Sequence, residues 1–139
     1  MRPERRIHDE RGGIITGSLL RYAVILVILG LVAIEGGSII FTVIRLQNAA
    51  DAAALRAADE WQSTGDIRTA RRAARAELDT KGQEEATITA IEADGAPTYE
   101  LRLTAQKEAP TILVGRIGFL EDLGVVDIEA DARPIEAGV

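Results

Sequence analysis

Few side chains in this chain of 139 residues are suited to acid–base, nucleophilic or metal chemistry. The sequence has no cysteine, which excludes disulfides, thiol catalysis and zinc–thiolate sites. His8 is the only histidine, and no nucleophile–base pair, phosphate loop or metal-ligand spacing is present. We therefore expect no catalytic residue, cofactor, metal or small-molecule substrate, and the sequence predicts that the protein is not an enzyme.

Three acidic residues occupy alternate positions in a short segment near the C-terminus. Asp127, Glu129 and Asp131 would share one face of a strand, because successive side chains of a strand point to opposite faces. Carboxylates placed in this way can hold a hard cation weakly. The alternative, which we favour, is a strand face that is simply solvated.

Glu35 is the most informative acid, because it lies inside a long apolar segment. A carboxylate at membrane depth is costly unless it is neutralised, hydrated or paired. One interpretation is a polar contact with a neighbouring subunit, to which Gly36, Gly37 and Ser38 would give close backbone access. The other places Glu35 near the outer membrane interface, where water reaches it.

The segment that carries Glu35 is long enough to cross a bilayer. Residues 19–44 are apolar except for Arg21, Glu35 and a few small residues, and a spanning helix needs about 20 such residues. Arg21 can extend its charge to the headgroups, and Arg45 ends the segment in the same way. A cleaved signal peptide and a buried soluble helix are the alternatives, but the sequence around Ala33 is a poor cleavage site.

The charge distribution predicts an orientation for this span. Arginines dominate before it, whereas acids outnumber bases after it, and the net charge is -6. Basic residues favour the cytoplasmic side, so we expect the N-terminus inside and the acidic part outside the cytoplasm. An acidic domain of this kind argues against a nucleic-acid partner and leaves membrane lipid as an expected contact.

The span continues into an alanine-rich helix, so we expect three parts: a cytoplasmic tail (1–13), a transmembrane and stalk helix (14–62), and a small extracytoplasmic α+β domain (63–139). Alanine has the highest helix propensity, and its small side chain allows another element to approach closely. The stalk would pack either on its own domain or on a neighbouring subunit. The residues that we expect to mediate the contact are Leu46, Gln47, Ala50, Asp51, Ala53 and Ala54.

The remaining residues predict a second helix and a three-stranded sheet. The helix would run over residues 66–81, capped by Thr64 or Asp66 and ended by Gly82. Residues 86–91 and 99–105 would form a hairpin around Asp94-Gly95, with Tyr99 on the inner face. A short helix from Pro110 to residue 123 would cover the sheet. Residues 126–133 would form the last strand, whose direction stays open.

The N-terminal motifs resemble a known family. Arg11-Gly12 precedes the apolar helix, Glu35 is followed by Gly36-Gly37, and residues 45–55 read Arg-Leu-Gln-Asn-Ala-Ala-Asp-Ala-Ala-Ala-Leu. This order resembles the TadE/TadG-like proteins of bacterial tight-adherence (Flp-type) pilus assembly. The chain has no room for the large von Willebrand-type domain of the longer members. Gly30 precedes Glu35 by five residues, as in prepilin peptidase sites, but too deep in the span for us to expect processing.

The resemblance implies a non-enzymatic, single-pass protein of the bacterial cytoplasmic membrane that helps to assemble or anchor a Tad/Flp-type pilus or a related secretion machine. Its partners would be other pilus or secretion subunits, contacted through the transmembrane helix, and it could form a homo-oligomer. The alternative is a membrane-tethered extracytoplasmic binding or sensing module unrelated to pili.

Overall fold

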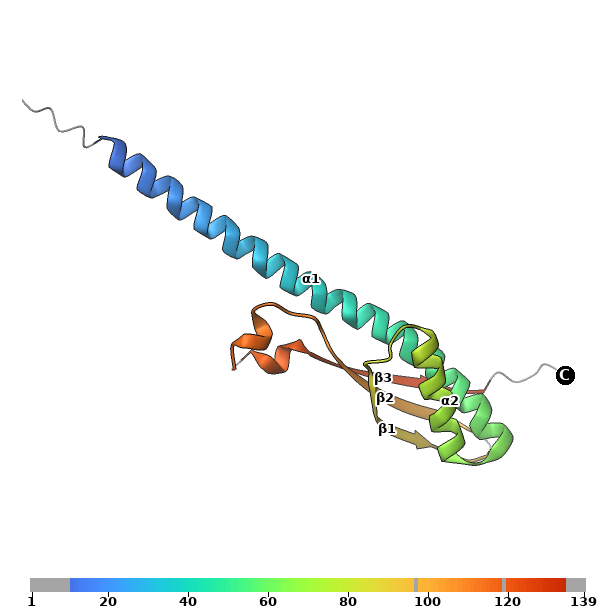
Figure 1. Cartoon of the computed structure of the whole chain (residues 1–139). Helices are drawn as coiled ribbons and strands as arrows, with labels where there is room; N and C mark the ends of the chain where they lie inside the picture. Colours follow the sequence, from blue (N-terminus) through green and yellow to red (C-terminus); the bar gives the residue numbers. More distant parts are fainter. Residues whose placement is uncertain (1–10, 97, 119, 135–139) are drawn as a thin grey trace, which may run out of the picture. The chain divides into compact units, whose positions relative to one another are not determined.

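The computed structural model describes residues 11–96, 98–118 and 120–134, so most of the predicted tail, with His8, lies outside the described residues. It confirms an α+β fold with a long N-terminal helix, one further α-helix and a three-stranded sheet (Figure 1). In chain order the elements are α1 (Arg11–Thr64), α2 (Ile67–Thr80), β1 (Thr87–Ala93), β2 (Leu101–Glu108), the 3-10 turns η1 (Val114–Arg116) and η2 (Glu121–Gly124), and β3 (Val125–Ala132).

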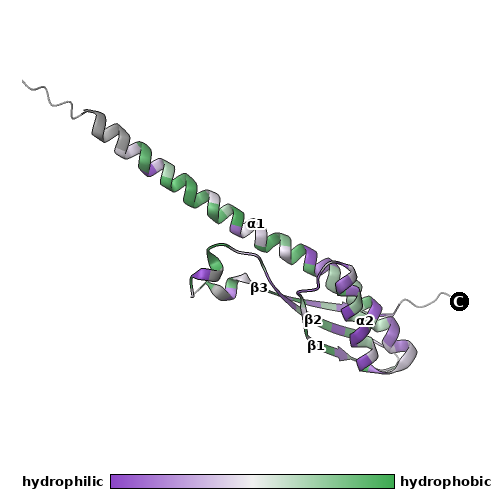
Figure 2. Cartoon of the chain, viewed as in Figure 1, coloured by the Kyte–Doolittle hydropathy of each residue, from purple (hydrophilic) through white to green (hydrophobic). Residues whose placement is uncertain are grey.

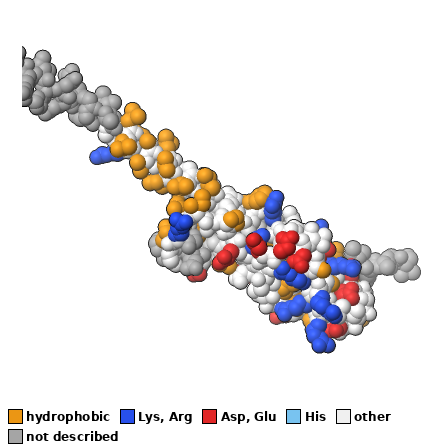
Figure 3. Space-filling view, viewed as in Figure 1, with side chains coloured by type: hydrophobic (Ala, Val, Ile, Leu, Met, Phe, Trp, Pro, Cys, Tyr) orange, Lys and Arg blue, Asp and Glu red, His pale blue; other side chains and the backbone are white. Residues whose placement is uncertain are grey.

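The chain divides into two compact units, residues 1–34 and 35–139. In the first unit, the described residues belong to α1. From Leu19 to Ile34 most of their apolar side chains are exposed; Leu26, for example, is 68% exposed. Figure 2 shows this part of α1 as predominantly hydrophobic, and Figure 3 shows hydrophobic side chains on its surface. Within the described part of the chain, α1 is the one helix that is long and apolar enough to cross a membrane. Exposed apolar side chains on every face suit a helix surrounded by lipid.

The second unit, called the head below, contains an antiparallel sheet in the order β1-β2-β3. The third strand, whose direction the sequence left open, therefore runs antiparallel to β2. Leu101, Leu103 and Ala105 of the central strand are buried, whereas Arg102 between them is exposed. One covered face and one wet face is the arrangement predicted from the alternating pattern.

A β-bulge lets the weakest predicted strand join this sheet. The register of β1 shifts between Ile88 and Ala90, so one extra residue is accommodated there. As a result Ile88 pairs with Ala105 and Ile91 pairs with Leu103, although the two isoleucines are an odd number of residues apart. Both isoleucines therefore pack against the core.

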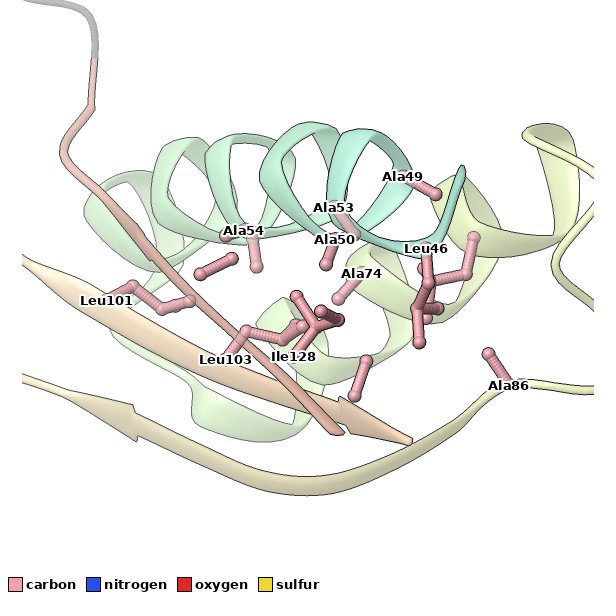
Figure 4. Close-up of a cluster of buried hydrophobic side chains, with 14 of the residues drawn as sticks. Leu46, Ala49, Ala50, Ala53, Ala54, Ala74, Ala86, Leu101, Leu103 and Ile128 are labelled. Atoms are coloured by element: carbon pink, nitrogen blue, oxygen red, sulfur yellow. The ribbon is translucent and has the colours of Figure 1, made fainter. Parts of the chain in front are cut away.

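Both α-helices bury their small side chains in the core over the covered face of the sheet (Figure 4). Leu46 and six alanines of α1 recur at helical spacing and are at most 2% exposed. Ala70, Ala74 and Leu78 supply the corresponding face of α2. Trp61, near the end of α1, donates its indole N–H to the carbonyl oxygen of Asp94 at 3.0 Å, which ties the helix to the hairpin turn.

The ends of α2 are fixed by local hydrogen bonds. An Asp66 side-chain oxygen accepts the N–H of Arg68 at 2.9 Å, as an N-cap does. At the other end, Gly82 has φ +71° and Gln83 donates its N–H to the carbonyl of Leu78 at 2.9 Å. A glycine is suited to this left-handed position, because a side chain there is strained. The predicted bounds of α2 are thus confirmed to within a residue.

Two predictions for the sheet and its cover are wrong. Tyr99 does not belong to β2, because its φ of 45° breaks the strand geometry before Leu101. The segment predicted as one helix from Pro110 to residue 123 has, in its described residues, the turns η1 and η2 and no α-helix. Gly115 and Gly118 weaken helix formation there. The apolar face of the sheet is covered by α1 and α2 instead.

We expect Leu103→Ala to destabilise the head by about 2–5 kcal/mol, because it would leave a cavity among fully buried side chains. Urea unfolding of the full chain in detergent micelles, followed by the fluorescence of Trp61, measures the change. Leu26→Ala removes the same atoms from an exposed position on α1 and serves as the matched control. Equal midpoints for the two variants would contradict the described core.

The stability of the head should also depend on pH through Asp66. Chiefly the N–H of Arg68, and also the hydroxyl of Thr69, hold the pKa of Asp66 below its ordinary value. A carboxylate whose pKa is lowered by folding stabilises the folded state fully at pH values above its unfolded pKa of about 4. This stabilisation is lost as the pH falls through the folded-state pKa. The stability difference between the wild type and Asp66→Asn should therefore shrink below about pH 4. A difference that persists unchanged in acid would refute this role.

Candidate functional site

Residues 110–123 form a loop, called the strap below, between β2 and β3. Ala109 donates its backbone N–H to the carbonyl of Gly124 at 2.7 Å, which closes the strap at its base. The strap contains η1 and η2, and Figure 1 shows it beside α1. It is the segment of the head that contacts the acid singled out in the sequence.

Glu35 is only 6% exposed and is held by the strap. Its Oε1 accepts the backbone N–H of Ile112 and that of Leu113, the latter at 2.7 Å. Its Oε2 is buried without a hydrogen-bond partner among the described residues. The acid therefore links two points 77 residues apart in the chain, and one of its oxygens keeps its acceptor capacity.

Two hydroxyl side chains lie on the same face of α1 as Glu35, and that of Ser38 adds a second contact with the strap. Ser38 donates its Oγ–H to the carbonyl of Pro110 at 2.6 Å, and Thr42 donates its Oγ1–H to the carbonyl of Ser38 at 2.9 Å. Residues 35, 38 and 42 are spaced three and four apart, so they follow one face of the helix into the buried position of Leu46. Polar contacts with the strap thus give way to apolar contacts with the sheet.

Gly36 and Gly37, which we predicted as part of a partner contact, face open space. A Cβ built at either position would have no atom within 4 Å. Gly37 is exposed, whereas Gly36 is half-buried. The head itself therefore does not require glycine at these positions for space, and a second helix could approach the α1 backbone here.

The six predicted stalk residues fall on two sides of α1. Leu46, Ala50, Ala53 and Ala54 are fully buried in the core of their own head. Gln47 is half-buried and Asp51 is exposed, and the Nε2–H of Gln47 donates to Oδ1 of Asp51 at 2.8 Å. The apolar members thus contact the sheet of the same chain, and the polar pair is the part that faces outward.

The acidic face of β3 is engaged by an arginine of the neighbouring strand. Arg102 lies 2.7 Å from Oε1 of Glu129 and 2.9 Å from Oδ1 of Asp131. These carboxylates, Asp131 first, hold the pKa of Arg102 above its ordinary value. Among the described residues, no group of three or more His, Cys, Asp or Glu side chains is arranged to hold a metal ion.

The fold and this site define a class of protein: a small α+β head whose first helix, α1, is long and apolar enough to span a membrane and carries the acid that holds the strap. Residues 15–60 match the family model described as putative Flp pilus-assembly TadE/G-like. The match lies within α1 and includes Glu35 and the alanine run, but not the strap. It confirms the resemblance found in the sequence and supports a pilus-related membrane protein. Neither the curated proteins nor the solved structures yield a match.

We expect Glu35→Ala to release the strap, because the N–H groups of Ile112 and Leu113 would lose their acceptor. Arg116 is exposed in the strap, so trypsin should cut after it faster in this variant than in the wild type. Glu35→Gln retains one oxygen acceptor and should have a smaller effect.

Cleavage after Arg72, an exposed residue of α2, is the internal control, because it does not depend on the strap. The assay uses the full chain in detergent micelles and compares initial rates at the two sites. A rate at Arg116 that is the same in the wild type and in Glu35→Ala would rule out Glu35 as the residue that holds the strap.

Proposed function

We propose that the chain is a non-enzymatic, single-pass subunit of a Tad/Flp-type pilus or a related secretion machine, which helps to assemble or anchor it. The observation that carries the proposal is the family match over residues 15–60, which coincides with the helix that is able to span a membrane. The description of that family refers to pilus assembly and not to a catalysed reaction.

The proposed placement is the bacterial cytoplasmic membrane, with the N-terminal tail inside and the head outside. The support is the charge asymmetry. Arginines precede the apolar helix, and among the charged residues after Arg45 acids outnumber bases. The proposed division follows the sequence, with residues 1–13 as the tail, 14–62 as the membrane and stalk helix and 63–139 as the small domain.

We propose that other subunits, or copies of this chain, contact the outward face of α1. Gly37, Ile40, Ile44, Asn48 and Asp51 are exposed at intervals of three or four residues and therefore lie along one stripe of the helix. The opposite face is occupied by the sheet, so this outer stripe is available to a partner helix. Gly37 on this stripe, with Gly36 beside it, would let the backbones approach closely.

The alternative function is a membrane-tethered binding or sensing module unrelated to pili. One observation favours it, a groove of about 870 Å³ in the head, lined among others by Phe41, Arg45 and Lys107. Lys107 already donates to Oε1 of Gln83 at 3.1 Å and lies 3.7 Å from Oε2 of Glu85. A ligand would have to replace these contacts, which makes subunit assembly the better-supported proposal.

Gly37→Leu tests the partner contact without disturbing the chain itself. The new side chain would meet nothing within 4 Å of its Cβ, and leucine favours a helix more than glycine does. We therefore expect normal membrane insertion and normal Trp61 fluorescence, but loss of co-purification with pilus or secretion subunits from bacterial membranes.

Gly30→Leu is the matched control, because its Cβ also meets nothing within 4 Å and its neighbours on α1 are exposed apolar residues. It should leave co-purification unchanged. If Gly37→Leu assembled as well as Gly30→Leu and the wild type, the outer stripe near Gly37 would not be a partner surface.

A further inference from the structure

We infer that the strap is a second membrane contact: it inserts into the interface of the outer leaflet, between the headgroups and the acyl chains, with lipid as its occupant. This inference rests on the proposed function in one respect, namely that α1 spans the membrane. The strap lies outside the residues that match the family model, so the evidence for this role comes from the strap and the residues that hold it.

The strap exposes four large apolar side chains. Ile112 is 55% and Leu123 60% exposed, and Leu113 and Ile117 are each 37% exposed. A contiguous apolar patch on a soluble surface marks a contact with another protein or with a membrane. The two exposed charged side chains described in the strap are Arg116 and Asp122, which an interface with polar headgroups can accommodate.

The position of Glu35 along α1 places the strap at the membrane boundary. A span that begins at Gly17, where the candidate membrane helix starts, reaches Ile34 after about 27 Å at the rise of an α-helix. The hydrocarbon core of a bilayer is about 30 Å thick, so Glu35, the next residue, falls at its outer edge. Because Ile112 and Leu113 donate to Glu35, the apolar side chains of the strap are held at that same edge.

Several backbone groups of the strap are hydrogen-bonded, as a medium with little water requires. Irregular backbone tolerates low polarity only where its N–H and C=O groups are paired. Glu35 accepts two of the N–H groups, and Ser38 donates to the carbonyl of Pro110. Within the strap, the N–H groups of residues 116, 117, 120 and 123 donate to carbonyls of residues 113, 114, 117 and 120, respectively. Burial of Glu35 is thus explained, because its carboxylate accepts two backbone N–H groups that would otherwise need water as their acceptor.

Lipid accounts for these features better than a protein partner does. The chain already enters the proposed hydrocarbon layer at Ile34, one residue before Glu35, to which the strap is attached, so lipid lies next to the strap in the proposed topology.

Site-specific labelling tests the inference, because the chain has no cysteine of its own. Full-length Ile117→Cys, Leu26→Cys and Ser63→Cys variants would each carry an environment-sensitive fluorophore. They would be reconstituted in vesicles of phosphatidylethanolamine and phosphatidylglycerol containing nitroxide lipids, with the spin label either shallow or deep. Trp61 fluorescence reports whether each head is folded, and Leu123→Cys replaces Ile117→Cys if the latter is not.

We expect the label at residue 117 to be quenched more by shallow than by deep nitroxides, with blue-shifted emission. The label at residue 26 should be quenched most by deep nitroxides, and the label at residue 63 by neither. Adding Glu35→Ala to Ile117→Cys should abolish most of the shallow quenching, because the strap would no longer be held at the boundary. Adding Glu35→Ala to Leu26→Cys should leave the quenching at residue 26 unchanged.

Three results would overturn the inference. In the first, the label at residue 117 emits like the label at residue 63, while deep nitroxides still quench the label at residue 26. The helix would then span the membrane and the strap would stay in water. Blue-shifted emission without lipid quenching, together with cross-linking between chains, would assign the patch to a second copy. Failure of quenching at both residue 26 and residue 117 would reject the membrane span of the proposed function, and the strap contact with it.

Discussion

The hydrogen bonds between Glu35 and the backbone of Ile112 and Leu113 are the interaction that holds the strap against α1. A buried carboxylate needs donors, and a loop with an irregular backbone needs acceptors. Each of these elements satisfies the other. Ser38 adds a contact with the carbonyl of Pro110, and Leu46 on the same face of α1 enters the apolar core. Within about three turns, α1 thereby changes from a helix with exposed apolar side chains to a wall of the head.

The alanine run has a structural role that follows from this arrangement. Alanines bring α1 close to a sheet whose inner residues are Leu101, Leu103 and Ile128, and α2 fills the remaining space with Ala70, Ala74 and Leu78. Because one side of α1 is used in this way, a partner has access only to the other side. Gln47 and Asp51 lie toward that outer side, bonded to each other and outside the core. The family match covers both sides of the helix, so the match alone does not separate residues needed for folding from those needed for assembly.

Local patterns predicted most of the fold, and long-range contacts account for what they missed. Asp66 and Gly82 mark the ends of α2 through hydrogen bonds within a few residues, so the sequence around them is sufficient. The strands alternate, and only the bulge near Ile88 obscures the pattern in β1. The strap was predicted as a helix because its apolar residues recur near helical spacing, although its glycines oppose one. Its attachment to α1 depends on an acid 77 residues away, which no local pattern reveals. Glu35 itself was found, because an acid in an apolar segment is conspicuous, but the donors that it accepts were not.

Hydrogen exchange of the amides of Ile112 and Leu113 tests the central interaction most directly. In the full chain, reconstituted in lipid bicelles, both amides should exchange slowly in the wild type. In Glu35→Ala they should exchange much faster, while buried amides of β2 keep their protection. Amides of Ile112 and Leu113 that exchange in the wild type as fast as in a solvated loop would contradict the account, because the acid would then not hold the strap.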